Sequence, residues 1–534
     1  MFEKKVLDVV TKLSGMTEEE LLHPKKGYIN NLSGVTKTLM LAVSKGERIT
    51  IVGDYDVDGI CATAILCTAL QSRHADVKVI LPRRFSDGYG LNINMIDRIS
   101  SGLIITVDNG IAAAEAIKKA KDKGLTVIVT DHHLPPTNDD GEIILPPADI
   151  IIDPHLPGTA TFEDYSGAGI AMKIANLLDA KDTNLFLALA AIAVIADSVP
   201  LKGENRWIVQ EGLKVLNGGG KTTMGLMALC QWAGEVITEK VIGFKIAPAI
   251  NAPGRIYDDG AVESFEAVMC NSKEAFSKIE HLTMINSARK ELKEKGIEEA
   301  KTLIPEDFKK PLVLYIPKMH EGIIGIIAGQ IAEEYKTPCL VFTDTKTEGI
   351  LKGSCRTYGG VHLKNLMDKE RELFERYGGH AGAAGASIKH ENLDKLREAL
   401  ERNCPEIKEN DKEFDIEVSE ADCWSVYDEI VKYGPYGEGC PEPIIKVAEF
   451  TPVFRGSEKF KVMAEKHTKF FGQYFDAVWF YHGNEEAEGI KSCSICGFLS
   501  ENVFKGESTL QFEIEKLTPK TPERRNGLHR FLGK

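Results

Sequence analysis

The chain has 534 residues, of which 43% are hydrophobic and 27% are charged, and its formal net charge is −14. A chain of this length is too long for one hydrophobic core, so we expect roughly three or four domains, and its composition is that of an ordinary globular protein. The acidic net charge excludes a surface that is basic everywhere, although a local basic patch for nucleic acid is compatible with it.

The cysteines and the apolar runs indicate the cellular compartment. Eleven cysteines are scattered along the chain, several of them inside apolar runs, as buried free thiols in a reducing compartment are. The N-terminal residues lack the continuous apolar core of a signal peptide. The longest apolar run, residues 185–196, has twelve residues, short of the roughly 18 that indicate a membrane span. We therefore expect a cytoplasmic protein that makes no membrane contact.

Three carboxylates at alternate positions follow the first apolar run with strand character. Residues 49–52 are typical of a short buried strand, and residues 60–70 are typical of a core helix. The sequence places Asp54, Asp56 and Asp58 in the turn between them. In an open α/β sheet this turn lies at the carboxyl end of the strand, where such folds bind their ligands.

The pattern of a strand followed by an acid recurs along the chain. Predicted strands at 103–107, 125–130 and 149–152 end at Asp108, Asp131 and Asp153, and His132 and His133 follow the second of these acids. Helical segments alternate with the strands, which predicts an α/β fold with a parallel, doubly wound sheet. A single terminal acid commonly marks only a helix cap or turn. Several carboxylates at one sheet edge repel one another unless a cation neutralises them, so we expect a metal site.

Two further features between the predicted strands and helices are open to two interpretations. The apolar helical stretch 184–199 carries Asp197 near its end, either as a solvated helix terminus or as the last ligand of the metal cluster. Arg83 and Arg84 follow a predicted strand at 77–81, either at a solvated corner or in contact with phosphate.

Four motifs together resemble the DHH phosphoesterase superfamily, and specifically its RecJ-type single-strand exonucleases. The motifs are residues 54–59, 107–110, 131–133 and 196–200. Their order and spacing also match those of the family. Together they are specific, although each motif alone is weak.

The ligand types indicate which cations the site binds. Carboxylate oxygens with one or two imidazoles suit Mn²⁺ or Mg²⁺, and this number of ligands favours two cations roughly 3.5–4 Å apart. With the resemblance, we assign as metal ligands Asp54, Asp56, Asp58, Asp108, His132 and Asp197, with Asp54 either a direct ligand or an acceptor behind the ligands. We expect Asp56, Asp108 and His133 to act in catalysis, with Asp108 or a neighbouring carboxylate between the metals. His133 is the expected donor to the phosphate or the leaving group.

The second half of the chain contains residues suited to a phosphate. Residues 250–255 are similar to a family motif whose arginine reaches the active-site phosphate, which here is Arg255; without the resemblance, Arg255 is an ordinary residue of a turn. The segment 378–385 is rich in glycine, which suits close approach of backbone N–H groups to phosphate or, alternatively, a tight packing turn. This region resembles the DHH-associated domain, which faces the catalytic domain across a cleft. The expected phosphate-binding residues are Arg255, Arg356, Gly379, His380 and His320.

The C-terminal part has the pattern of a small β domain. Short β-like runs after residue 444 predict an antiparallel, OB-like barrel. Its aromatic residues Phe470, Phe471, Tyr474 and Trp479 either stack on bases or belong to the core. Cys493 and Cys496 have no second pair at zinc-ribbon spacing and are interpreted as structural. The last seventeen residues are basic, as in a tail that contacts nucleic acid or is disordered.

These features predict four domains. They are a DHH catalytic domain with an N-terminal helical segment at 1–200, a helical connector at 201–305, a DHH-associated domain at 306–405, and an OB-like nucleic-acid-binding domain with a basic tail at 406–534.

The resemblance implies a metal-dependent exonuclease that degrades single-stranded DNA from the 5′ end to mononucleotides in DNA repair and recombination. Its implied partners are single-stranded DNA and a single-strand-binding protein or a helicase. One alternative is a nuclease of short RNA or cyclic dinucleotides, although such relatives generally lack the connector and the OB-like module. Another is an inactive DNA-binding replication scaffold, although all the motif ligands are present here.

Overall fold

In the computed structural model the chain forms two compact units. The smaller unit consists of Met1–Lys25, Pro200–Trp207 and Lys412–Lys534, and the larger unit consists of Lys26–Val199 and Ile208–Asp411. The structure describes residues 2–138, 140–234, 236–407, 413–463, 467–480, 482–483, 487–504 and 507–520. Within these residues, no helix is both long enough and apolar enough to cross a membrane.

The first sheet of the larger unit has the strand order β2-β1-β3-β4-β5. Its strands are β1 (Ile49–Val52), β2 (Val77–Ile80), β3 (Leu103–Val107), β4 (Thr126–Thr130) and β5 (Ile150–Ile152). Neighbouring strands pair in parallel throughout, which confirms the predicted doubly wound sheet. The strand order reverses between β1 and β3, and the carboxyl ends of such a pair are where open sheets bind their ligands.

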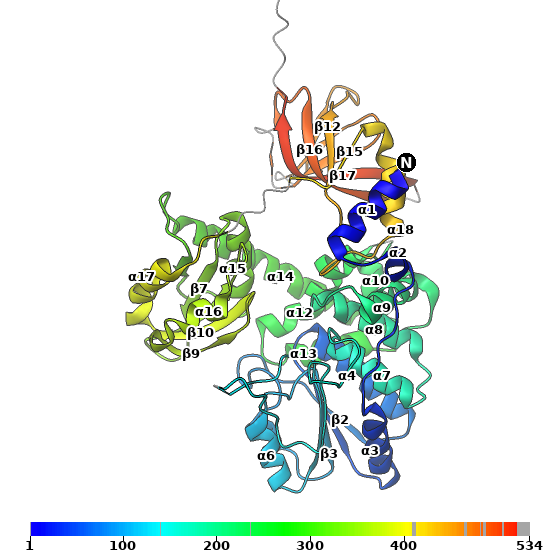
Figure 1. The fold of residues 1–534 in the computed structure, drawn as a ribbon, viewed down its shortest axis with the longest axis vertical. Helices are drawn as coiled ribbons and strands as arrows, with labels where there is room; N and C mark the ends of the chain where they lie inside the picture. Colours follow the sequence, from blue (N-terminus) through cyan, green and yellow to red (C-terminus); the bar gives the residue numbers. More distant parts are fainter. Residues whose placement is uncertain are drawn as a thin grey trace, which may run out of the picture. The chain divides into compact units, whose positions relative to one another are not determined.

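Helices cover both faces of this sheet (Figure 1). They are α3 (Leu32–Ser44), α4 (Val57–Ser72), α5 (Ile93–Asp97), α6 (Ala114–Asp122), α7 (Gly167–Leu177) and α8 (Thr183–Ala196). Helix α4 is apolar almost all round and packs against α7 and α8. Residues of α5 and α6 pack instead with Val52, Ile104 and Val127 of the sheet.

Helix α4 begins earlier than the sequence indicated. The Asp56 carboxylate accepts a hydrogen bond from the Gly59 N–H (3.0 Å) and caps the helix, which satisfies an N–H that the helix itself leaves unpaired. Asp58 therefore lies in the first helical turn and not in the preceding loop. The prediction of all three acids in the turn is wrong for Asp58 because the cap residue is itself one of the acids.

The connector is helical, as predicted. Its α-helices are α9 (Gly203–Lys214), α10 (Met224–Ala233), α11 (Glu239–Val241), α12 (Ala247–Ile256), α13 (Gly260–Met269) and α14 (Ala275–Thr302). The prediction of a turn around Arg255 from the residues alone is wrong, because residues 250–255 lie in α12 despite Pro253. Burial of Ile250, Ala252 and Pro253, with α12 packed on α13 and α14, outweighs the local breaker signal.

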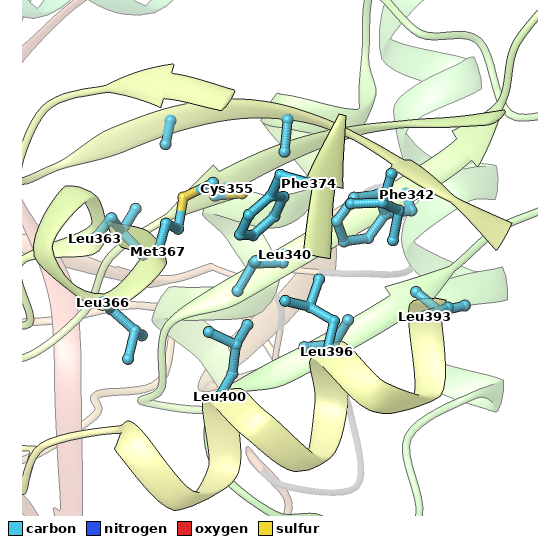
Figure 2. Close-up of a cluster of buried hydrophobic side chains, with 14 of the residues drawn as sticks. Leu340, Phe342, Cys355, Leu363, Leu366, Met367, Phe374, Leu393, Leu396 and Leu400 are labelled. Atoms are coloured by element: carbon cyan, nitrogen blue, oxygen red, sulfur yellow. The ribbon is translucent and has the colours of Figure 1, made fainter. Parts of the chain in front are cut away.

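A second, mixed sheet follows with the order β6-β7-β8-β10-β9. Its strands are β6 (Leu312–Tyr315), β7 (Cys339–Asp344), β8 (Ile350–Arg356), β9 (Phe374–Gly379) and β10 (Ala383–Lys389), and the helices beside them are α15 (Ile324–Glu334), α16 (Leu363–Asp368) and α17 (Leu393–Asn403). Figure 2 shows leucines of α17 directed at the side chains of the strands, which include Leu340, Phe342 and Phe374. This core confirms the predicted second α/β domain.

The glycine-rich segment 378–385 is a hairpin and not an irregular loop. Gly378 and Gly379 end β9, and β10 begins at Ala383. A Cβ atom on Gly379 would lie 2.3 Å from the Ala383 carbonyl oxygen, and its φ is +148°. Close packing of the hairpin therefore accounts for Gly379.

The smaller unit contains a sheet with the order β11-β12-β16-β17-β15-β14-β13. Its strands are β11 (Ile416–Val418), β12 (Ile445–Phe450), β13 (Phe460–Met463), β14 (His467–Phe470), β15 (Asp476–Trp479), β16 (Cys493–Phe504) and β17 (Glu507–Pro519), and its helices include α1 (Phe2–Ser14), α2 (Glu18–Leu22) and α18 (Cys423–Lys432). The prediction that all strands pair antiparallel is wrong, because β11–β12 and β15–β17 are parallel pairs.

The aromatic residues singled out in this unit divide into two groups. Phe470 and Phe471 are buried in the core. Tyr474 is exposed, and Trp479 stacks on His482 with ring centroids 3.8 Å apart. Only Tyr474 of the four is therefore exposed as an aromatic platform requires.

The remaining C-terminal expectations concern the cysteines and the tail. Cys493 and Cys496 are buried free thiols, and neither belongs to a possible metal-binding group among the described residues, in agreement with a structural role. The basic tail lies outside the described residues beyond Lys520.

The domain boundaries at 200, 305 and 405 stay predictions. Residues Met1–Lys25 belong to the same compact unit as Lys412–Lys534 and not to that of the first sheet, whereas the sequence analysis attached them to the catalytic domain.

Arg206 is a fully buried charge in the smaller unit, with 0% of its surface exposed. Its guanidinium donates to the carbonyl oxygens of Leu21 (2.7 Å), Tyr433 (2.6 Å), Gly434 (2.8 Å) and Pro435 (2.8 Å). Arginine has five donors and no acceptor, so a cage of carbonyl dipoles suits it. The side chain thereby joins segments that are far apart in the sequence.

We predict that Arg206→Ala lowers the free energy of unfolding of the smaller unit by about 3 kcal/mol or more, because several buried carbonyl groups lose their donor. Denaturant titration followed by fluorescence measures the change. The control is Arg48→Ala, which removes an exposed ion pair with Asp76 (2.8 Å) and is expected to cost less than about 1 kcal/mol. Equal losses in the two variants would contradict the role of Arg206.

Candidate metal centre

The acids that follow β1 and β3 meet at the carboxyl edge of the first sheet. Asp54, Asp56 and Asp108 offer oxygen atoms that all lie within 4.8 Å of one another. Asp58, His132 and Asp197 form a second such group, and Asp108, His132 and His133 form a third. All the residues that the sequence analysis assigned as metal ligands are thus brought together.

Two of these groups share no residue. The group of Asp54, Asp56 and Asp108 has no member in common with the group of Asp58, His132 and Asp197, so this edge offers two sets of ligand atoms. Asp108 connects the groups, because its Oδ1 lies 3.0 Å from His132 Nε2. Asp108 therefore lies between the two groups of ligand atoms.

The ring of His132 is oriented toward the carboxylates. Its Nε2 lies 3.5 Å from Asp58 Oδ2 and 3.6 Å from Asp197 Oδ2. The ring also hydrogen-bonds to the backbone of Tyr165, and burial followed by the neighbouring His133 lowers the pKa of His132 to about 3. A neutral imidazole held by a second hydrogen bond is the form that binds a metal ion.

Helix α7 holds Asp58 in place from its N-terminus. The Asp58 oxygens accept hydrogen bonds from the N–H groups of Gly167 (2.6 Å) and Ala168 (2.7 Å). The first N–H groups of a helix have no partner within the helix and favour negative charge. A Cβ atom on Gly167 would lie 2.5 Å from Asp108 Cβ, so only glycine lets the helix come this close.

The carboxylates oppose one another's ionisation. Burial and the charge of Asp56 raise the pKa of Asp58 to about 7, and burial followed by Asp58 raises the pKa of Asp197 to about 8. Burial also raises the pKa of Asp54 and of Asp108 well above the usual range. Among the described residues, no lysine or arginine pairs with any of these acids. The donor set therefore fits hard divalent cations such as Mn²⁺ or Mg²⁺.

Asp131 belongs to the third motif, but the sequence analysis did not assign it a role in the site. Its buried carboxylate accepts hydrogen bonds from His133 Nδ1 (2.8 Å) and from the backbone N–H of Ile111 (2.8 Å). Burial lowers the pKa of His133, but the hydrogen bond and charge of Asp131 outweigh it and raise the pKa to about 9. His133 is 45% exposed at its side chain. It is thus a protonated donor that faces solvent.

Tyr89 was not singled out from the sequence either. Its hydroxyl donates to the Asp108 carbonyl oxygen (3.1 Å) and lies 3.0 Å from His133 Nδ1. The next residue, Gly90, donates its N–H to Asp54 (3.3 Å). The loop after β2 therefore borders the site, and no pattern of acids or histidines in the sequence marks it.

A group of arginines lies beside the acidic site. Burial, followed by the charges of Arg84, Arg289 and Arg356, lowers the pKa of Arg255 to about 9. Within the part of the chain that the structure describes, Arg84, Arg255 and Arg356 have no carboxylate partner, whereas Arg83 pairs with Asp259 (2.7 Å). Uncompensated guanidinium groups that repel one another are typical of an anion site.

Arg84 is therefore more than a solvated corner. Its guanidinium lies 4.5 Å from the ring centroid of Tyr55, a residue between two of the candidate ligands, and its charge acts on both Arg255 and Arg356. Arg83, which pairs with Asp259, fits the other interpretation, that of a residue at a solvated corner.

The two histidines predicted to contact phosphate, His320 and His380, differ in their surroundings. His380 lies in the β9–β10 hairpin, where partial burial of the ring, followed by the charge of Arg356, lowers its pKa. His320 accepts from the Gly322 N–H (3.1 Å) at Nδ1, and its Nε2 lies 3.0 Å from the Ile256 carbonyl oxygen. Both ring nitrogens of His320 are thus engaged, so the structure does not support its assignment as a phosphate donor.

Sequence comparisons agree with this architecture. The DHH family N-terminal domain matches residues 48–196, the DHHA1 domain matches residues 309–406, and the RecJ OB domain matches residues 414–516. The single-stranded-DNA-specific exonuclease RecJ of Escherichia coli is 30% identical over 94% of this chain and 93% of its own length. The protein of the same name from Haemophilus influenzae is 29% identical over 95% and 94%.

Solved structures show the same fold. RecJ of Thermus thermophilus in complex with Mn²⁺ matches with a TM-score of 0.79 and 26% identity, over 97% of this chain and 78% of that chain. The complex of the same protein with Mg²⁺ matches with a TM-score of 0.74 and 24% identity, over 97% and 77%. The domains of the larger unit are those of a DHH-type protein with its associated DHHA1 domain. The third domain is a RecJ OB domain, and the relatives named above are RecJ proteins. The chain therefore belongs to the RecJ family.

We predict that Mn²⁺ raises the melting temperature more at about pH 8.5 than at about pH 6. In the cation-free protein, the raised pKa values of Asp58 and Asp197, about 7 and about 8, mean that the folded state binds more protons than the unfolded state between about pH 4 and about pH 8. The free energy of unfolding therefore falls as the pH rises across this interval and reaches its low level above about pH 8. Mn²⁺ at about 100 times its Kd should add about 2.7 kcal/mol.

Scanning calorimetry with and without Mn²⁺ measures both effects. Asp108→Asn should raise the stability of the cation-free protein at about pH 8.5 and lose most of the stabilisation by Mn²⁺. Asp122→Asn, at an exposed position at the end of α6, is the matched control and should behave as the unmodified chain. The assignment of Asp108 as a metal ligand would be contradicted if Mn²⁺ raised the melting temperature equally at both pH values and equally in Asp108→Asn and the unmodified chain.

Proposed function

We propose that the chain is a divalent-metal-dependent exonuclease that hydrolyses phosphodiester bonds of single-stranded DNA. The observation that supports this most is the convergence of five carboxylates and two histidines beside uncompensated arginines in a chain of the RecJ family. Mn²⁺ or Mg²⁺ is the proposed cofactor, because the donor set suits both cations and the structures named above contain them.

We assign Asp54, Asp56, Asp58, Asp108, His132 and Asp197 as the residues that hold the metal ions. Divalent cations held there would supply the activation of water and the neutralisation of charge on the scissile phosphate. The chain's own contribution is to fix the carboxylates, with α7 holding Asp58 and the backbone of Tyr165 orienting His132. These contacts set the geometry before substrate binds.

We assign His133 as the proton donor to the phosphate or the leaving oxygen. Asp131 engages Nδ1, and Nε2, which lies 3.3 Å from the Tyr89 hydroxyl, is the proposed donor. The pKa of about 9 keeps the ring protonated at neutral pH. Proton donation to a leaving oxygen is general acid catalysis. Asp131 thus acts through His133 and does not itself touch the substrate.

Arg255 and Arg356, with His380 and the backbone at Gly379, are the proposed contacts to the substrate phosphate. Arg255 comes from α12 and Arg356 from the end of β8, so two separate elements contribute guanidinium groups. Arginine suits this role because its planar donors match phosphate oxygens. Arg84 joins these two as a further phosphate contact.

Finer aspects of the proposal rest on the family resemblance. We propose degradation from the 5′ end to mononucleotides, a role in DNA repair and recombination, and action in the cytoplasm. Single-stranded DNA is the proposed nucleic-acid partner, and a single-strand-binding protein or a helicase is the proposed protein partner.

We predict that Asp56→Ala and His132→Ala each lower the Mn²⁺-dependent release of nucleotides at least about 10³-fold, because each removes a metal ligand from the reaction centre. Acid-soluble release from labelled single-stranded DNA measures the rate, and circular dichroism checks folding. Asp122→Asn is the control and should keep full activity. Undiminished rates in folded Asp56→Ala would refute the site assignment.

The polarity is tested with end-blocked substrates. Single-stranded DNA and RNA, each blocked at one end in turn and incubated with Mn²⁺, should show digestion only of DNA with a free 5′ end. Equal digestion of a 5′-blocked strand would contradict the proposed polarity. Preferred digestion of short RNA would favour the alternative substrate class.

A further inference from the structure

The second sheet has a free edge at β6. This strand pairs in parallel with β7 and stands at the end of the strand order. The N–H groups of Leu312 and Ile316 donate to the carbonyl oxygens of Pro338 (2.9 Å) and Phe342 (2.9 Å). Alternate residues of a parallel strand bond to the same neighbour. The intervening residues Val313 and Tyr315 therefore direct their backbone groups away from β7.

These outward backbone groups are only partly satisfied. Arg397 Nε donates to the Val313 carbonyl oxygen (3.0 Å). Among the described residues, the N–H groups of Val313 and Tyr315 and the Tyr315 carbonyl oxygen have no hydrogen-bond partner. Val313 is only 7% exposed, and a buried N–H without a partner costs free energy. The edge thus offers two donors and one acceptor in a row.

The free edge forms the floor of a cavity of about 630 Å³. Val313 packs in the core with Leu393 of α17, whereas Leu312 and Leu314 face the other side of the sheet, where Phe308 packs. The cavity is lined on these two sides by Leu393, Asp394, Arg397 and Glu401 of α17 and by Leu303, Pro305, Phe308 and Lys309 before the strand. The strand edge therefore lies between two walls.

The charged side chains of the groove neutralise one another. Lys309 pairs with Glu401 (2.8 Å), and Arg397 pairs with Asp394 (2.7 Å). The other lining residues include the apolar Leu303 and Phe308, and His390, whose ring centroid lies 4.9 Å from that of Tyr315. A segment without charge is the complement of such a groove, because a charged one would lose its hydration without gaining a free partner.

We propose that this groove binds an extended, uncharged, apolar segment of a partner protein, which adds a strand to the sheet beside β6. Such strand addition combines main-chain hydrogen bonds with side-chain pockets. The length of β6, at about 3.3 Å per residue, suits a segment of about four to six residues. A second copy of this chain does not fit, because its own β6 edge lies on the floor of the same kind of groove. The groove shares no residue with the metal centre.

The first test uses defined peptides and the full-length protein. The probes are fluorescein-labelled hexapeptides, capped at both ends, that alternate valine with threonine, leucine with serine, or phenylalanine with threonine. Each is also made in two forms that are N-methylated at the odd or the even positions. Fluorescence polarisation should show saturable binding of at least one probe. Its two N-methylated forms should differ in affinity by about tenfold or more. Only one edge of the peptide faces β6, so methylation removes the N–H donors to β6 in one form and leaves them intact in the other.

The second test changes the groove. Leu303→Asp, at a side chain that is 45% exposed, should weaken the binding about tenfold or more, whereas the matched control Leu41→Asp on α3, at a side chain that is 54% exposed, should not. Val313→Pro should also abolish binding, because it removes an outward N–H and leaves the pairing with β7 intact. Release of nucleotides should be unchanged in all three variants, which checks their folding.

Several outcomes would overturn the proposal. They are the absence of saturable binding by every probe, equal binding of the two N-methylated forms, and binding that Leu303→Asp leaves unchanged. Dimers in sedimentation experiments that Leu303→Asp dissociates would also overturn it, since they would make a second copy the occupant.

Discussion

Mutual repulsion among buried carboxylates is the constraint on which the site depends. Asp58 and Asp108 are 1% and 2% exposed, and burial together with neighbouring acids raises the pKa of both. A fold that buries such groups loses stability at neutral pH unless cations enter. The binding of divalent metal ions is therefore coupled to the stability of the domain as well as to its chemistry.

The surrounding structure holds the carboxylates against this repulsion. Reversal of strand order between β1 and β3 brings Asp108 beside the acids that follow β1. The N-terminus of α7 binds both oxygens of Asp58, and Gly167 permits the close approach of this helix to Asp108. Asp131 plays the corresponding part for His133. The contacts that fix Asp58 thus come from a distant segment of the chain, whereas the contact that fixes His133 comes from its own motif.

The arginines repel one another in the same way as the buried carboxylates, with positive instead of negative charges. Arg255, Arg84 and Arg356 come from separate elements of the larger unit, and their charges act on one another. An acidic cluster that attracts cations and a basic cluster that attracts phosphate therefore lie close together. The charge of the whole chain, −14, reveals neither, because only local charge density determines what a site binds.

The sequence by itself determined the doubly wound sheet and the set of acids and histidines, because strand periodicity and the spacing of charged residues are local properties. It indicated the family only through the resemblance of its motifs to known ones. It did not determine that Asp58 belongs to α4, that Arg255 lies in a helix, or that His320 has both ring nitrogens engaged. Nor did it reveal the contact of Tyr89 with His133, or the free edge of β6 beside α17. These features depend on capping, on burial and on packing between segments far apart in the chain, which only the tertiary structure decides.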